Sequence, residues 1–192
     1  MKKVPLILLA MSFLIWACSN ETKDSVEKAD SANKANIDSP SSQQPTVTTD
    51  EETSSFLVKA ANGGMAEVKL GEIAQQKATN PKVKDFGSMM VHDHSSDNDK
   101  VKTLAAQRNV TLPTAVSDES QKDIDDCSRK SGRDFDKAYI NAMVKKHQAT
   151  IDMFEKAANT INDADVKTFI NNTLPKVKEH LDSAKAIQKA MT

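Results

Sequence analysis

Four stretches of the chain, each about 27 to 30 residues long, carry apolar side chains at helical spacing along one face. They cover residues 50–79, 81–108, 133–159 and 163–190. Thr49 and Glu52 have the spacing of a capping box, and Pro81 follows Asn80 as the first residue of a helix would. Aromatic residues make up only 4% of the chain, which disfavours a β-sandwich. The sequence therefore predicts an all-α fold, a four-helix bundle.

The connection between the second and third long helices should contain a short extra helix. It begins at Ser117 and Asp118, runs to about Lys130, and ends before Gly132. A connection of about 24 residues can run from one end of the bundle to the other. It therefore permits the ferritin-like order, in which the second and third long helices run parallel.

Glycine and proline mark two places where the helices should be irregular. Gly64 and Gly71 share a face, so we expect either a close approach of the first two helices or a local kink near Glu67. Pro175 lies inside the last helix and should kink or split it, because proline removes one backbone hydrogen bond.

Each long helix carries one ionisable side chain near the middle of its apolar face. These residues are Glu67, His94, His147 and His180. In the ferritin-like order they fall within about four residues of one level, or about 6 Å along the bundle. His92 lies about 160° around the helix from His94 and should face water.

Two explanations account for this polar layer, since burying such groups without partners costs several kcal/mol. In the first, the four side chains hydrogen-bond with one another, with water or with helix carbonyls. In the second, they bind one transition metal (zinc, copper or iron), with Asp93, Asp136 and Tyr139 as neighbours that orient the ligands. Met90 and Met143 would favour copper if their sulfur atoms were ligands, and otherwise fill the core.

The N-terminal residues resemble a bacterial export signal. Residues 1–18 contain two lysines, an apolar run, and Ala17 followed by Cys18, which is the layout of a lipoprotein signal peptide. We expect lipidation of Cys18, with a plain secreted chain or an uncleaved anchor as alternatives, because Trp16 is bulky for such a site. Residues 19–49 are polar and should form a flexible tether to the membrane. The chain is thus expected in the outer membrane or periplasm.

Charge and cysteine content narrow the function further. The formal net charge is −1, so bulk electrostatics give no reason to expect a nucleic-acid partner. If Cys18 is lipidated, Cys127 has no intramolecular disulfide partner and should be a small, partly buried side chain. A reactive thiol is the alternative for Cys127.

Several motifs resemble one bacterial family over about residues 53–187. They read FLVKAANGGMAEVKLGEIAQQKATNPKVKDFGSMMVHDHSSDNDKV, then FDKAYINAMVKKHQATIDMFEKAA, then TLPKVKEHL. The family is the domain of unknown function numbered four-one-four-two (DUF4142), often labelled putative outer membrane protein. The resemblance implies a ferritin-like bundle exported to the cell envelope, with no established activity. The third long helix is also similar to copper-associated ferritin-like proteins, although Lys146 replaces one histidine of their pair.

Binding is the leading functional prediction, with Glu67, His94, His147 and His180 as ligands of one metal. The alternative is a structural or protein-interaction module, for example in envelope stress, whose polar layer only fixes helix register; its protein partner is unknown. An enzyme is the third possibility. A di-iron oxidase is disfavoured, because the residues three positions before the three histidines are valines rather than glutamates.

Overall fold

The computed structural model describes residues 23–38 and 49–191, and these residues form six α-helices and no strand. The helices are α1 Ser25–Asp38, α2 Glu51–Lys77, α3 Pro81–Gln107, α4 Asp118–Ser128, α5 Gly132–Thr160 and α6 Ala164–Ala190. The predicted all-α class is confirmed. Within the described ranges, no helix has both the length and the hydropathy that crossing a membrane requires.

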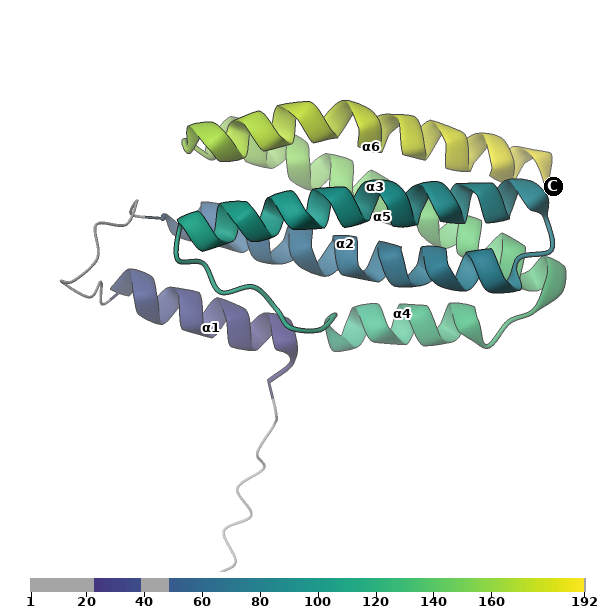
Figure 1. The fold of residues 1–192 in the computed structure, drawn as a ribbon, viewed down its shortest axis with the longest axis horizontal. Coiled ribbons are helices and arrows are strands. Elements are labelled where there is room, and N and C mark those ends of the chain that lie inside the picture. The colour runs from purple at the N-terminus through teal and green to yellow at the C-terminus, as the bar shows by residue number, and fades with distance from the viewer. Residues whose placement is uncertain (1–22, 39–48, 192) are drawn as a thin grey trace, which may run out of the picture.

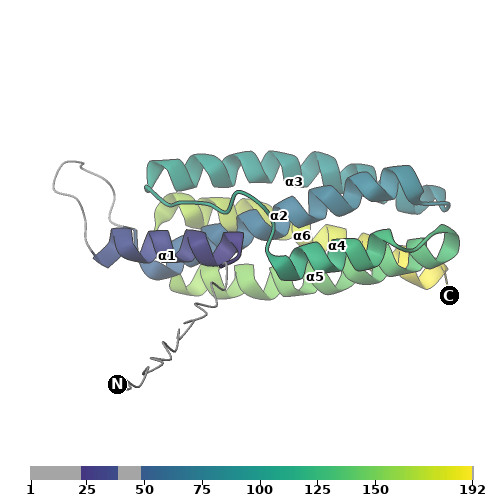
Figure 2. The ribbon, with the colours of Figure 1, turned by 90° about the horizontal axis from the view of Figure 1, so that it is seen from below.

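The four long helices α2, α3, α5 and α6 lie side by side as a bundle, and the shorter α1 and α4 lie along one side of it (Figures 1 and 2). Helices α3 and α5 run in the same direction. The turn before α3 contacts the start of α5 through hydrogen bonds from Thr79 and Asn80 to Asp136. At the opposite end, Arg108 after α3 pairs with Asp163 before α6. This is the single-crossover order of ferritin-like bundles.

The crossover returns along the bundle through the loop 108–117 and then α4 (Figure 1). The side chain of Ser117 caps α4 by accepting a hydrogen bond from the amide of Ser120. Helix α4 ends at Ser128, two residues earlier than expected, and Gly132 has the positive φ of 57° that favours glycine. The predicted extra helix in this connection is therefore confirmed.

The starts of the long helices follow local capping chemistry. Asn80 caps α3 by accepting a hydrogen bond from the amide of Lys82, and Pro81 is the first helical residue, as predicted. At α2 the predicted capping box is wrong: Asp50 is the cap and accepts from the amide of Thr53. Thr49 instead donates a hydrogen bond to the carbonyl of Arg108. Helix α6 is not split at Pro175 but continues through it.

Helix α1 overturns part of the predicted tether, because residues 25–38 are helical and pack on α2. Ala29 is buried, and Val26 lies against the same apolar cluster. The buried Asn33 accepts a hydrogen bond from the amide of Thr111 and donates one to its carbonyl. The polar sequence of residues 25–38 predicted a flexible segment, but tertiary contacts with the crossover loop stabilise a helix there. The rest of the tether and the signal peptide with Cys18 lie outside the described residues, apart from residues 23, 24 and 49.

Two glycines permit a close approach of α2 and α3. A Cβ atom on Gly71 would lie 2.8 Å from the carbonyl oxygen of Gly87, and one on Gly87 would lie 2.8 Å from the Cβ of Ala74. Gly64 makes room for a side chain of α3, since a Cβ there would overlap the side chain of Asn98. The expected close approach is confirmed, with Gly87 as its second member.

The polar layer lies between two apolar clusters of the bundle. One cluster surrounds Phe56, Phe154 and Phe169, whose rings pack edge-on or tilted at centroid distances of 5.1–6.4 Å. The other surrounds Phe135 and Tyr139, which stack at 6.0 Å. Apolar packing on both sides fixes the position of the layer along the bundle.

Candidate metal centre

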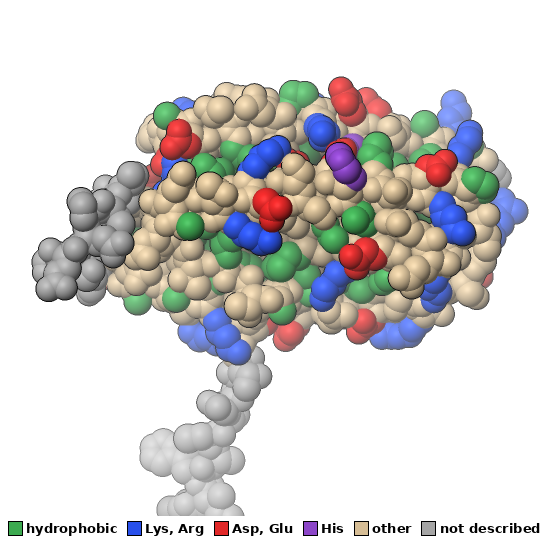
Figure 3. Space-filling view, viewed as in Figure 1, with side chains coloured by type: hydrophobic (Ala, Val, Ile, Leu, Met, Phe, Trp, Pro, Cys, Tyr) green, Lys and Arg blue, Asp and Glu red, His purple; other side chains and the backbone are tan. Residues whose placement is uncertain are grey.

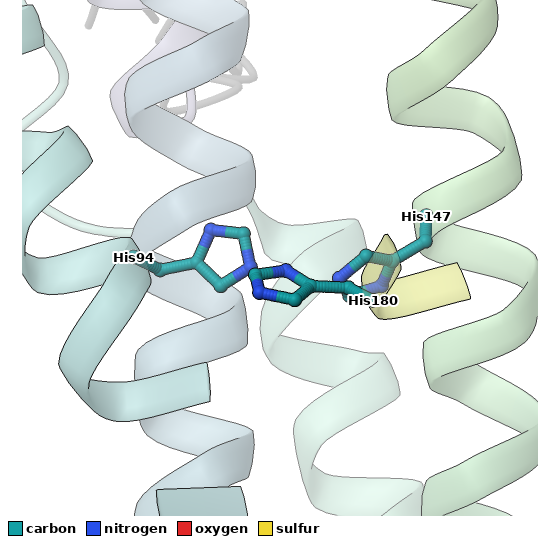
Figure 4. A group of neighbouring side chains, drawn as sticks. All are labelled: His94, His147 and His180. Atoms are coloured by element: carbon teal, nitrogen blue, oxygen red, sulfur yellow. The ribbon is translucent and has the colours of Figure 1, made fainter. Parts of the chain in front are cut away.

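The structure brings the four predicted layer residues together from four helices. Glu67 comes from α2, His94 from α3, His147 from α5 and His180 from α6, and all four are buried. The ring centroids of the three histidines lie 5.5–5.6 Å from one another, with their planes 61–74° apart. Figure 4 shows the three rings directed toward one another across the centre of the bundle.

His180 is held by Asp93, whose Oδ2 atom lies 2.9 Å from Nε2 of the ring. Burial raises the pKa of Asp93, but hydrogen bonds from His92 and His180 and the charge of Lys176 outweigh it and lower the pKa to about 2. Asp93 is therefore a carboxylate that only accepts, so Nε2 of His180 donates. The proton on Nε2 leaves Nδ1 of the neutral ring with its lone pair.

His147 is held by its own helix. Its Nδ1 atom lies 2.9 Å from the carbonyl oxygen of Met143, one turn earlier in α5. Since a carbonyl only accepts, Nδ1 carries the proton and Nε2 keeps the lone pair. Burial lowers the pKa of His147 more than the neighbouring Glu67 raises it, so the ring is neutral.

His94 faces Glu67, with Nδ1 of the ring 3.4 Å from Oε2 of the carboxylate. The other carboxylate oxygen of Glu67 lies 3.7 Å from Nδ1 of His147. Glu67 is only 3% exposed, and its ion pairs in the described part of the chain are with these two histidines. The buried carboxylate thus faces the Nδ1 edges of both rings.

Each histidine therefore has one nitrogen that faces a protein acceptor and one that lacks a partner. The nitrogens without a hydrogen-bond partner in the described structure are His94 Nε2, His147 Nε2 and His180 Nδ1. Leaving a buried polar atom unsatisfied costs about 1–3 kcal/mol, and native proteins have few of them. Three such atoms in one layer require an explanation.

A metal ion bound by all three rings would supply one explanation. One ligand atom from each histidine lies within 4.8 Å of the others. A point equidistant from three atoms 4.8 Å apart is about 2.8 Å from each, about 0.7 Å longer than a zinc–nitrogen bond. Small rotations of the rings would close this difference. The donor set fits zinc or copper, and the opposite nitrogens of His147 and His180 already have the hydrogen-bond partners typical of metal-bound histidines.

Burial lowers the pKa of both His147 and His180. Burial lowers the pKa of His180 to about 4, even though the hydrogen bond to Asp93 raises it. The ring therefore offers a lone pair without first losing a proton. A metal would not have to displace protons from His147 and His180 near neutral pH.

Other predicted neighbours lie elsewhere in the bundle. Asp136 was expected to orient a ligand, but it accepts hydrogen bonds from Thr79 and Asn80 at the α2–α3 turn. It precedes His147 by 11 residues, which is about 16 Å along a helix. Both aspartates were named from the family resemblance, which does not show what either side chain contacts. Asp93, in contrast, does contact a layer histidine.

Tyr139, Met90 and Met143 belong to the apolar cluster that surrounds Phe135. The ring of Phe86 lies 6.3 Å from Tyr139 and 6.3 Å from His147. The Tyr139 hydroxyl has no hydrogen-bond partner in the described structure, and burial raises its pKa. Met90 and Met143 are fully buried in the same cluster, which supports their reading as core residues.

The predictions for His92 and for Cys127 can also be compared with the structure. His92 faces water, as expected, and its side chain is 86% exposed. Cys127 is free and buried, and burial raises the pKa of its thiol to about 11. A thiol with this pKa is almost entirely protonated at neutral pH, which disfavours the reactive alternative.

Sequence reasoning missed a pocket beside the layer. The cavity has a volume of about 50 Å³ and lies between α2, α3, α5 and α6. Glu67 and His94 line it, as do Gly63 and Asn98. The pair of adjacent glycines in α2 was the available signal, since residues without side chains leave room beside a helix.

The site and fold define an all-α protein with a buried three-histidine cluster. Among known families, the one described as Domain of unknown function (DUF4142) matches residues 37–187, and this chain belongs to it. The predicted family is thus confirmed. No curated protein and no solved structure matches the chain significantly.

Proposed function

We propose that this protein binds one divalent transition-metal ion through His94, His147 and His180. The observation that carries the proposal is the division of each ring into a held nitrogen and an unpartnered one. A purely structural layer would satisfy both nitrogens of a ring or leave the free ones unrelated. Here the three free nitrogens belong to rings that converge within 4.8 Å.

The ligand chemistry favours zinc or copper over iron. Three neutral imidazoles without a thiolate suit both metals, and copper binds such sites more tightly in the general order of divalent affinities. Non-haem iron commonly uses two histidines and a carboxylate. Glu67 instead faces the Nδ1 edges of His94 and His147, opposite to the free Nε2 atoms. We therefore assign Glu67 to orienting these rings, although it was first considered as a ligand.

The charges around the three histidines also support binding of a divalent ion. Glu67 is a buried acidic residue whose pairs in the described structure are histidines, and Asp93 is ionised beside His180. A divalent ion between the three rings would offset these two negative charges. The burial of Glu67 would then be compensated electrostatically.

We further propose that the domain acts in the cell envelope, attached to a membrane through lipidated Cys18. This part of the proposal rests on the sequence of residues 1–18. The surface is compatible with it: basic and acidic side chains are mixed over the face in Figure 3, so this face offers no extended basic surface for nucleic acid.

The proposal is tested by thermal unfolding of the full chain after removal of metals by a chelator. Zinc or copper at a hundred times its dissociation constant should add about 2.7 kcal/mol of stability. For a chain of this size the midpoint should rise by about 5–10 °C. The rise should be lost in His94→Ala and kept in His92→Ala, which removes an exposed histidine two residues away.

The negative result is equally clear. If neither metal raises the midpoint of an intact fold, the layer is a register device, as in the alternative hypothesis. If His92→Ala abolishes the rise as His94→Ala does, the ion binds at the surface and not in the layer.

A further inference from the structure

The pocket beside the polar layer connects it to the outside of the bundle. Its lining begins with the exposed Lys59 and the half-buried Gly63 and Asp97, and reaches the buried Glu67 and His94. Of the three histidines of the proposed metal centre, only His94 lines this pocket. The pocket therefore reaches the centre beside His94.

A gap in the packing of α2 creates this opening. A Cβ atom placed on Gly63 would have no other atom within 4 Å. At Gly64 the missing side chain gives space to Asn98, whose Oδ1 atom lies too close to the Cβ position for a larger residue to fit. Two glycines thus leave room for a polar side chain and for solvent, at a cost to the helix of about 1 kcal/mol each.

We infer that the fourth coordination position of the bound metal opens into this pocket and takes a water molecule or a small exogenous ligand there. The inference rests on the proposed metal centre, whose three histidines leave one position of a tetrahedral ion without a protein ligand. Structural zinc sites fill all four positions with protein groups, whereas sites that bind an external molecule keep one open.

The size of the pocket limits the ligand. A cavity of about 50 Å³ holds about three to five water molecules at 10–15 Å³ each. A linear ligand of three heavy atoms fits this space. Glu67 in the lining would accept a hydrogen bond from a ligand that carries a proton, such as water.

The test uses the full chain loaded with cobalt(II), whose visible absorption changes when a ligand is added to the metal. Titration with azide should change the spectrum. Gly63→Leu should weaken the azide response at least tenfold while cobalt affinity is unchanged, because the new side chain enters free space and covers the pocket.

Gly63→Ala is the matched control, since its methyl group is too small to cover the pocket, and it should respond as the original chain does. Bound cobalt with no azide response would overturn this inference alone and leave the metal centre standing. The same conclusion follows if Gly63→Leu responds as fully as Gly63→Ala. If cobalt does not bind, the proposed metal centre fails as well.

Discussion

The carboxylate of Asp93 accepts a hydrogen bond from Nε2 of His180 across 2.9 Å, and this contact determines which nitrogen of His180 faces the other two rings. Asp93 also contacts His92 and Lys176 near the surface. It therefore links the exposed side of α3 and α6 to the buried layer. The orientation of one proposed ligand depends on a residue that is itself partly accessible to solvent.

Asp93→Asn should weaken metal binding without unfolding the protein. Asparagine can still accept the hydrogen bond from His180, but it lacks the charge that makes the imidazole a better donor to the metal. Loss of such a partner typically costs 10–100-fold in affinity. Competition with a chromogenic chelator measures this change. Asp99→Asn is the control, because Asp99 is exposed and pairs with Lys102; equal affinity in both variants would contradict the role of Asp93.

The stability of the metal-free protein should fall as the pH is lowered from about 6.5 toward 4. Burial lowers the pKa of His180 to about 4, from about 6.5 in the unfolded chain, so the unfolded chain binds the extra proton in this range. The contribution is fully present above pH 6.5 and is lost as the pH falls. One such group changes the free energy of unfolding by at most about 1.4 kcal/mol per pH unit.

Urea unfolding at several pH values between 4 and 7.5 measures this dependence. His180→Gln cannot be protonated and should show a shallower dependence than the original chain. The pKa of His147 is lowered as well, so part of the slope should remain in that variant. Stability that is flat or rises on acidification in this range would contradict a neutral, buried His180.

Gly71→Ala and Gly63→Ala should have opposite effects on stability. At Gly71 the added methyl group would meet the backbone of Gly87, which cannot move aside cheaply, and we expect a loss of about 1–3 kcal/mol. At Gly63 the methyl group meets free space, so helix propensity dominates and we expect a gain of about 0.4–1 kcal/mol. Denaturant unfolding of both variants tests the close contact of α2 and α3; equal effects would refute it.

Asp163→Ala should destabilise the fold far more than Asp165→Ala. The side chain of Arg108 is 4% exposed and pairs with both aspartates, but Asp163 is largely buried and also caps α6. Removing the buried partner leaves a buried charge, which costs about 3–5 kcal/mol. Asp165 is 74% exposed on its side chain, so its loss should cost below about 1 kcal/mol. Chemical denaturation at pH 7 compares the two.

The long helices could be predicted because most local signals agreed. Apolar periodicity and the cap at Asn80 indicated where the helices lie, and the long crossover permitted the parallel order of α3 and α5 that the structure has. Helix α1 could not be predicted, because its sequence is polar and its stability comes from Asn33 and the crossover loop, about 78 residues away. Contacts at such separation leave no periodic signal in the sequence.

The sequence predicted which residues form the site, but it did not predict the role of each residue in it. One polar residue on each apolar face identified Glu67 and the three histidines, and the structure brings them together. Which nitrogen of each ring is free depends on side-chain rotation and on partners such as the Met143 carbonyl. For the same reason, spacing alone could not separate Asp93, which contacts His180, from Asp136, which binds the α2–α3 turn.

The most direct test of the metal centre is X-ray absorption at the zinc or copper edge of the loaded full chain. Three imidazole rings should appear around one ion, with metal–nitrogen distances of about 2.0–2.1 Å for zinc. The fourth scatterer should be a light atom without an imidazole pattern. His92→Ala should give the same spectrum, and His147→Ala should lose one ring. A spectrum without imidazole scattering, or a loaded ion bound only by oxygen, would contradict the account.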